Sequence, residues 1–300
     1  MRNRNIEIFQ DTWEAAQNGF YHAGERRVPL KLTQAQMEYA KVYLPQDVAA
    51  IGITEAEKRV PFDTRCAYSC VNEDSFSHAL HLSKSCPELL DGCNRREVLV
   101  LNLANPVNPG GGVRKGSKAQ EEDLCRRSTL LRSLEGPCAR GYYAYNRSLN
   151  TFMGSHAIVM TPQVEVFKDM NGEPLEESAV VAVMTCAAPM ITYGMEGLTQ
   201  EEYRTMVYER IVGMLRCAAH WGYGVLVLGA FGCGAFSNDA RIVSDLFYEA
   251  LCHFEYQGMT ADEVFRRIDF AVLSREGRTY NFDEFSRNFS DFYREGKGEE

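Results

Sequence analysis

Apolar residues recur at helical spacing in the first part of the chain. Over residues 6–17 and 33–40 they return every three or four positions, which predicts two helices. Gly19 and Gly24 lie between these segments and interrupt the pattern. We therefore expect residues 1–60 to form an N-terminal helical extension that packs on a larger domain of residues 61–300.

Strand-like and helix-like segments alternate along the rest of the chain. The continuous apolar run at residues 98–103 predicts a strand that is buried on both faces. Further strands are expected at residues 65–71, 157–161, 179–185, 224–229 and 268–273, and helices at residues 74–82, 119–133, 199–221 and 238–254. This alternation predicts an α/β fold in which helices cover both faces of a mixed or parallel sheet.

The composition is that of a chain that buries a core. Of 300 residues, 45% are hydrophobic and 24% are charged, which excludes disordered, collagen-like and small disulfide-stapled proteins. The formal net charge of −9 makes direct binding of duplex nucleic acid unexpected, because phosphate neutralisation needs a basic face. An anionic ligand would have to be held by a local device, such as backbone N–H groups.

Neither a signal peptide nor a membrane span is expected. Residues 1–17 are charged and lack the apolar centre of a signal peptide. No apolar run approaches the roughly 18 residues that a span needs. The ten cysteines are too sparse and irregular for a disulfide scaffold, so we expect reduced thiols and a cytoplasmic location.

One stretch of the chain concentrates residues that bind metals: Cys66, Cys70, His78, His81, Cys86 and Cys93. No Cys-x-x-Cys pair occurs among them, and the two histidines fall in a predicted helix. A zinc site is therefore less favoured than buried cysteines beside an ordinary helix, and we expect no metal and no cofactor.

Two glycine-rich loops each follow an apolar strand and precede a helix. The first contains Gly110, Gly111 and Gly112, and the second spans residues 229–236 with the sequence Gly-Ala-Phe-Gly-Cys-Gly-Ala-Phe. Neither loop is a P-loop, and neither has the Gly-x-Gly-x-x-Gly pattern of dinucleotide sites, which disfavours an NTPase or a nicotinamide-dependent enzyme. A diphosphate bound by backbone N–H groups fits both loops.

A pair of acidic residues lies in the first turn of the helix after the first loop. Gln120-Glu121-Glu122 is compatible with a solvated pair that the helix dipole favours, and also with a reactive site. Successive helical residues point about a hundred degrees apart, so we do not expect two facing carboxylates. Arg114, Lys115 and Lys118 nearby either steer a polyanion or form an ordinary solvated loop, and both interpretations stay open.

These motifs together resemble the microbial branch of the poly(ADP-ribose) glycohydrolase family. The resemblance rests on the glycine triplet, a gap of seven residues and then Gln120-Glu121-Glu122, followed by the loop at residues 229–236. Residues 69–74, 102–105 and 181–189 are also similar, and the resemblance covers roughly residues 60–290. It implies a macrodomain-like fold, three layers in the order α/β/α with a mixed central sheet, and a catalytic domain over residues 61–300.

The resemblance also implies an activity and roles for particular residues. The activity is hydrolysis of ribose–ribose O-glycosidic bonds, which releases ADP-ribose from poly(ADP-ribose) on modified proteins. Glu122 corresponds to the general acid and base, and Glu121 to the residue that holds the distal ribose hydroxyls. The substrate contacts implied are Gln120, Asn105, Asn108, Gly110, Gly111, Gly112, Gly232, Cys233, Gly234, Ala235 and Phe236, with Phe282 or Tyr280 as an adenine platform.

Two alternative functions remain at this point. One is a binding module that reads ADP-ribose without cleaving it, and the other is a hydrolase that acts on mono-ADP-ribose. A reader has no need for Gln120-Glu121-Glu122, which favours an enzyme.

Overall fold

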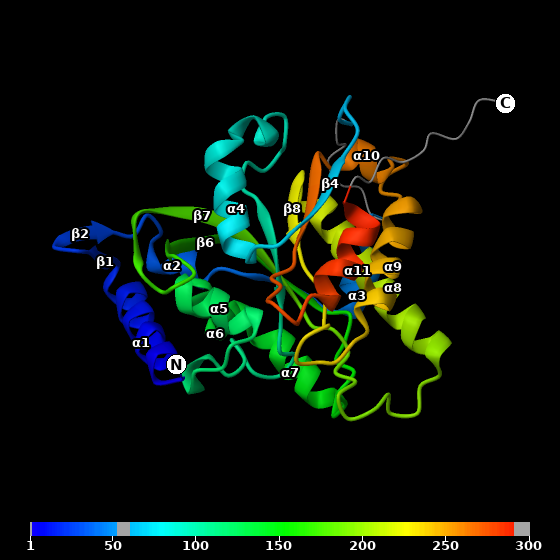
Figure 1. The fold of residues 1–300 in the computed structure, drawn as a ribbon, viewed down its shortest axis with the longest axis horizontal. Coiled ribbons are helices and arrows are strands. Elements are labelled where there is room, and N and C mark those ends of the chain that lie inside the picture. Colours follow the sequence, from blue (N-terminus) through cyan, green and yellow to red (C-terminus); the bar gives the residue numbers. More distant parts are fainter. Residues whose placement is uncertain (1, 53–60, 291–300) are drawn as a thin grey trace.

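The computed structural model describes residues 2–52 and 61–290, which form a central sheet between two layers of helices (Figure 1). The sheet has seven strands in the order β3-β6-β7-β5-β8-β9-β4. Their bounds are β3 Lys41–Tyr43, β4 Ala67–Val71, β5 Leu99–Leu103, β6 Ile158–Lys168, β7 Pro174–Cys186, β8 Val225–Leu228 and β9 Arg267–Ala271. The pairs from β7 through to β4 are parallel, whereas β3 and β6 pair in the antiparallel direction, so the sheet is mixed as expected.

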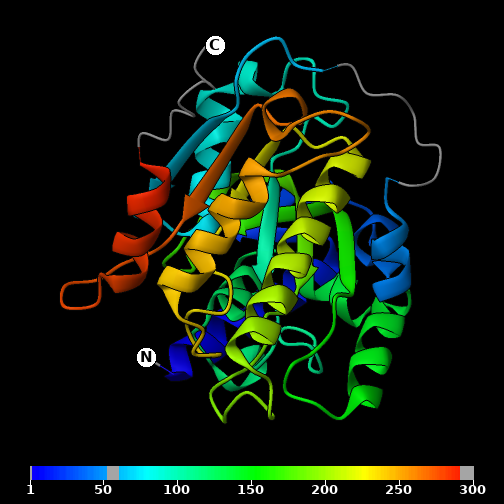
Figure 2. The same ribbon diagram turned by 90° about the vertical axis from the view of Figure 1, so that its right-hand side faces the viewer.

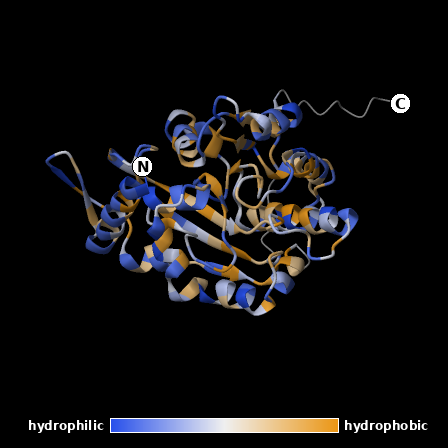
Figure 3. Ribbon diagram, turned by 60° about the horizontal axis from the view of Figure 1, so that its bottom comes forward, coloured by the Kyte–Doolittle hydropathy of each residue, from blue (hydrophilic) through white to orange (hydrophobic). Residues whose placement is uncertain are grey.

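The central strands are apolar on both faces because both faces are covered. Leu99 and Leu101 of β5 belong to one core cluster, and Val98 and Val100 belong to the other. The helices over the first cluster are α3 Pro45–Ala50, α8 Gln200–Trp221, α9 Ala240–Cys252, α10 Ala261–Val264 and α11 Tyr280–Phe289. Figure 2 looks onto this layer, and Figure 3 shows apolar residues concentrated along the strands and on the helix faces next to them.

The opposite face of the sheet carries the other helical layer: α1 Arg2–Asn18, α4 Ser75–Ser85, α5 Gln120–Arg127, α6 Leu130–Glu135 and α7 Arg140–Leu149. The 3-10 turns Pro87–Leu90, Val113–Lys115 and Pro137–Ala139 connect parts of this layer. No helix in the described part of the chain is long and apolar enough to cross a membrane. The predicted three-layer macrodomain-like fold is confirmed.

The structure differs from the expected elements in two places. The single helix predicted over residues 119–133 is two helices, α5 and α6, because the chain breaks at Ser128 and Thr129. Ser128 bridges to Val166, and the Thr129 N–H donates to the Glu165 carbonyl at 3.0 Å. The pairing of Ser128 and Thr129 with β6 therefore ends α5 and separates it from α6.

The N-terminal segment is also less helical than predicted. Between α1 and α2 (Gln34–Glu38), the chain forms a hairpin of β1 (Phe20–Ala23) and β2 (Arg26–Pro29), and β3 then joins the main sheet. Gly24, with φ of +62°, makes the tight turn between the hairpin strands. The proposed boundary after residue 60 lies outside the described residues, so the division into two domains stays a prediction.

Candidate active site

A cavity of about 730 Å³ opens at the carboxyl ends of the parallel strands. Its wall includes residues that lie one or two positions after the ends of β5, β8, β9 and β4: Asn105, Ala230, Val272 and Glu73. Ligands of open α/β sheets bind at this edge, because the loops there are free to diverge from the strands. The first turn of α5 and the loop after β8 complete the wall.

Gln120 fixes the start of α5 against the end of β5. Its Oε1 accepts from the Leu103 N–H at 2.9 Å, and its Nε2 donates to the Leu101 carbonyl at 2.7 Å. Nε2 also contacts Ser75 Oγ at 3.1 Å. Gln120 borders the cavity, but its amide oxygen and its amide nitrogen both form hydrogen bonds within the protein. These contacts are those of a residue that positions α5.

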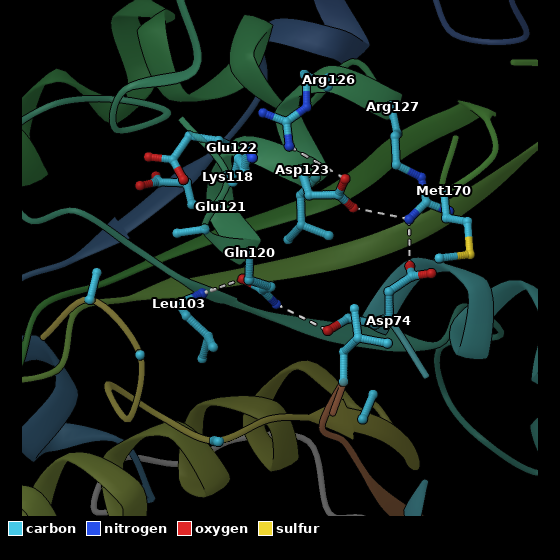
Figure 4. A pocket seen from close by; sticks show the side chains of 18 of the residues that line it. Asp74, Leu103, Lys118, Gln120, Glu121, Glu122, Asp123, Arg126, Arg127 and Met170 are labelled. Carbon is cyan, nitrogen blue, oxygen red and sulfur yellow. Dashed lines mark hydrogen bonds and ion pairs between the residues drawn. The ribbon is translucent and has the colours of Figure 1, made fainter. Parts of the chain in front are cut away.

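Glu121 and Glu122 follow on this anchored turn, and both carboxyl groups are buried (Figure 4). Glu121 accepts from the Asn105 N–H at 2.7 Å and from the Gly110 N–H at 3.2 Å. Glu122 Oε1 accepts from the Gly112 N–H at 2.9 Å. Its other oxygen, Oε2, is buried without a hydrogen-bond partner in the described structure, although the residue lines the cavity.

The glycine triplet allows the two carboxyl groups to come this close to the backbone. A Cβ on Gly111 would lie 2.5 Å from Glu122 Oε1 and 3.2 Å from Glu121 Oε2. Gly110 and Gly111 also have φ of +65° and +55°, the left-handed region that favours glycine. The carboxyl groups of Glu121 and Glu122 therefore both lie beside Gly111.

Burial determines the charge of Glu121. It raises the pKa of Glu121 to about 8, the N–H of Asn105 opposes the shift, and the negative charge of Glu122 adds to it. The helix N-terminus favours an ionised carboxylate, but the loss of water around Glu121 outweighs that effect. The pair therefore carries less than two negative charges at neutral pH.

The two candidate asparagines of the first loop differ in position. Asn105 lines the cavity, and its Oδ1 accepts from the N–H groups of Val107 at 3.0 Å and Asn108 at 2.8 Å. Asn108 is exposed, and its carbonyl accepts from the Gly111 N–H at 3.0 Å. Asn108 thus shapes the turn from outside, whereas Asn105 can reach a ligand.

The second glycine loop forms the facing wall with Gly232, Gly234, Ala235 and Phe236. Cys233 differs from the expectation, because its N–H donates to the Ala230 carbonyl at 3.0 Å and its side chain packs against the apolar core. A backbone N–H used in this way is not available to a diphosphate.

Asn238, which the sequence analysis did not single out, holds the second loop in place. Its Nδ2 donates to the Pro189 carbonyl at 2.8 Å and to the Gly232 carbonyl at 3.0 Å. Its Oδ1 accepts from the buried Tyr203 hydroxyl at 2.7 Å. The only sequence signal was an asparagine just before a helix, which is common in any turn.

Neither aromatic residue proposed for the adenine platform is among the residues that line the cavity. Phe282 packs against the apolar core, and the Tyr280 hydroxyl donates to Asp239 at 3.1 Å. Asn281, between them, borders the cavity and donates to the Cys233 carbonyl at 3.3 Å. Both aromatic residues lie in helix α11, whose first turn presents Asn281 instead.

A buried ion-pair group forms another part of the wall. Arg127 pairs with Asp74 and, at 3.0 Å, with Asp123. Asp74 also caps α4, accepting from the Ser77 N–H at 2.9 Å. Although burial opposes it, Arg127 with the Ser77 hydrogen bond holds the pKa of Asp74 below its usual value.

The basic residues near the first loop have separate surroundings. Arg114 pairs with Glu135 at 2.8 Å, and its guanidinium lies over the rings of Phe9 and Trp13. Lys118 borders the cavity. Steering of a polyanion therefore fits Lys118 better than Arg114.

The candidate metal stretch has no metal-binding geometry. His78 contacts Asp269 at 2.7 Å and Glu73 at 3.2 Å. No group of three or more cysteine, histidine, aspartate or glutamate side chains within residues 2–52 and 61–290 is arranged to hold a metal ion.

Comparison with known proteins identifies the family. The family model of the microbial-type PARG catalytic domain matches residues 9–169. This chain belongs to the microbial-type poly(ADP-ribose) glycohydrolase family. The predicted family and the glycohydrolase class are thereby confirmed.

Solved structures of bacterial relatives agree with this assignment. The poly(ADP-ribose) glycohydrolase of Thermomonospora curvata is 29% identical, with a TM-score of 0.84 over 96% of this chain and 100% of that one. The Deinococcus radiodurans enzyme in complex with ADP-ribose is 30% identical, with a TM-score of 0.72 over 86% of this chain and 98% of that one. A search of curated proteins found no match.

Proposed function

We propose that this chain hydrolyses the ribose–ribose bonds of poly(ADP-ribose), with Glu122 as the general acid and base. The observation that carries the proposal is the Glu122 carboxyl group itself. One oxygen is fixed by the Gly112 N–H, and the other is buried in the cavity wall without a protein partner. A carboxyl oxygen kept from water and from other donors is suited to a hydrogen bond with substrate.

The reaction follows from this arrangement. When substrate is bound, Glu122 takes up a proton and gives it to the departing ribose oxygen as the bond from that oxygen to the anomeric carbon breaks. Positive charge develops on the sugar, and the cavity then admits water to the anomeric carbon. As the oxygen of that water bonds to the anomeric carbon, the Glu122 carboxylate takes a proton from it, which restores the acid and leaves free ADP-ribose.

Glu121 supports the reaction without transferring the proton. Its carboxyl group is oriented by Asn105 and Gly110, beside Gly111 and therefore beside Glu122. We assign it to the hydroxyl groups of the distal ribose. Because its pKa is raised to about 8, it is largely neutral at pH 7 and repels a bound diphosphate less than an ionised carboxylate would.

The second loop is the proposed diphosphate site. Gly232, Gly234 and Ala235 border the cavity, and the hydrogen bonds of Asn238 fix the loop before any ligand arrives. A loop that is already fixed loses little freedom on binding. Phe236 is assigned to packing against the distal ribose.

We further propose that the polymer is attached to modified proteins and that the enzyme acts in the cytoplasm. None of the ten cysteines, which all lie within the described residues, forms a disulfide, and this supports a reducing compartment.

Release of ADP-ribose from poly(ADP-ribosyl)ated protein tests the proposal, measured with and without EDTA. Release that EDTA does not change supports a metal-independent glycohydrolase. Binding of ADP-ribose without release would instead make the chain a reader. Release from a mono-ADP-ribosylated protein, but not from the polymer, would change the substrate and keep the enzyme class.

A further inference from the structure

Two exposed aromatic side chains lie in contact with each other on the surface. Phe152 and Tyr193 have exposed fractions of 49% and 75%, and their ring centroids are 5.3 Å apart at an interplanar angle of 49°. Single exposed aromatic residues are common on proteins, and they need no explanation. A contacting pair from two different loops presents a larger apolar surface to solvent.

The loop that carries Tyr193 is bonded to the second glycine loop. The Ile191 N–H donates to the Phe236 carbonyl at 3.0 Å, and the Thr192 hydroxyl donates to the Ala235 carbonyl at 2.9 Å. Ala235 and Phe236 line the cavity. Tyr193 therefore comes directly after two residues, Ile191 and Thr192, that hydrogen-bond to the cavity wall.

The loop that carries Phe152 is bonded to both of its neighbours. The Met190 N–H donates to the Phe152 carbonyl at 2.9 Å, and the Phe152 N–H donates to Glu196 at 2.9 Å. On the other side, a Cβ on Gly154 would lie 3.6 Å from Pro106 in the first glycine loop. The loops that carry the aromatic pair therefore contact both glycine loops that line the cavity.

The chemistry of the polymer brings a base close to the catalytic carboxyl group. In poly(ADP-ribose) the departing oxygen is a hydroxyl of the adenosine ribose of the neighbouring unit. The adenine of that unit is attached to the same ribose, so it leaves the cavity within one nucleoside of Glu122. Stacking on aromatic side chains is the usual way in which proteins hold such a base.

We propose that Phe152 and Tyr193 form a second base site, which stacks the adenine of the neighbouring ADP-ribose unit on the leaving-group side. This inference rests on the proposed function and deepens it, because such a site makes the enzyme prefer a polymer to a single unit. The pair lies outside the catalytic carboxyl groups, and neither Phe152 nor Tyr193 lines the cavity.

Equilibrium binding tests the second base site separately from catalysis. The probes are ADP-ribose and a purified molecule of two linked ADP-ribose units, both measured with Glu122→Gln so that nothing is cleaved. We expect the two-unit ligand to bind about 10-fold more tightly than ADP-ribose, the scale of one base stacked on aromatic side chains. Adding Phe152→Ala and Tyr193→Ala should remove this advantage and leave the affinity for ADP-ribose unchanged.

Matched variants separate stacking from an unspecific effect. Phe152→Tyr and Tyr193→Phe keep the rings and should keep the two-unit advantage, and Tyr39→Ala removes an aromatic residue of 48% exposure elsewhere. Equal affinities for both ligands before the aromatic substitutions, or an advantage that survives Phe152→Ala with Tyr193→Ala, would overturn the second base site. If the double variant folds poorly, the affinities for the two ligands are compared in Tyr193→Ala alone, and the same outcomes apply. Failure of wild-type chain to release ADP-ribose would count against the proposed function and leave this binding test intact.

Discussion

The Gly112 N–H donates to Glu122 Oε1 at 2.9 Å, which joins the catalytic helix to the glycine loop that precedes it. This bond holds one carboxyl oxygen and leaves Oε2 for the substrate. A neighbouring glycine, Gly111, leaves room for the carboxyl group because it has no side chain. The first glycine loop therefore positions the Glu122 carboxyl group before any ligand binds.

Gly111→Ala should reduce kcat by about 100-fold or more, since a small misplacement of a catalytic group has effects of that size. The added Cβ would meet Glu122 Oε1 at 2.5 Å and push the carboxyl group away. Steady-state kinetics on poly(ADP-ribose) measures the change. Gly24→Ala is the control, because Gly24 has a similar φ of +62° and nothing within 4 Å of its Cβ. An equal loss of kcat in both variants would show that backbone strain, not the position of Glu122, is responsible.

The raised pKa of Glu121 predicts a pH-dependent stability. Between pH 4.5, the ordinary value, and pH about 8, the unfolded chain gives up this proton while the folded chain keeps it. The free energy of unfolding therefore falls as the pH rises through this window, and it levels off above the folded pKa. Glu121→Gln removes this contribution, so the stability of wild type relative to the variant should decline by a few kcal/mol across the window.

Denaturant unfolding of wild type and Glu121→Gln at several pH values between 5 and about 8.5 measures this difference. Groups that titrate in both proteins cancel in the comparison. A difference that stays constant over the whole range would mean that Glu121 is ionised in the folded protein.

Asn238→Ala should weaken ADP-ribose binding by about 10-fold, because loosening the second loop adds an ordering cost to binding. The variant should also be destabilised by about 2 kcal/mol, since it leaves buried polar partners without hydrogen bonds. Tyr203→Phe is the matched control, as it removes only the 2.7 Å bond to Asn238 Oδ1 and leaves Nδ2 on Gly232 and Pro189. Calorimetric titration with ADP-ribose measures both variants. Unchanged affinity in Asn238→Ala would separate this residue from the ligand site.

Much of the fold was predictable because its signals are local. The apolar run of β5 and the capped helix after Thr199 need no knowledge of distant residues. The break between α5 and α6 was not predictable in this way, because it depends on pairing of Ser128 and Thr129 with β6, more than thirty residues further along the chain.

The candidate site was predicted in part for the same reason. Glu121 and Glu122 follow a glycine triplet in sequence, so their motif is visible without a structure. Asn238 acts through Gly232 and Pro189, and Phe282 in α11 packs against the core and does not line the cavity. Such assignments depend on tertiary contacts, which a single sequence does not display.

The central claim is that Glu122 supplies the proton, and Glu122→Gln tests it most directly. The amide keeps the shape of the side chain and an oxygen for the Gly112 N–H, but it cannot act as an acid. The measurement is the rate of ADP-ribose release from poly(ADP-ribose), together with the dissociation constant for ADP-ribose. We predict a loss of about 1000-fold in rate with a dissociation constant within about 3-fold of wild type. Release at the wild-type rate by Glu122→Gln would contradict the assignment.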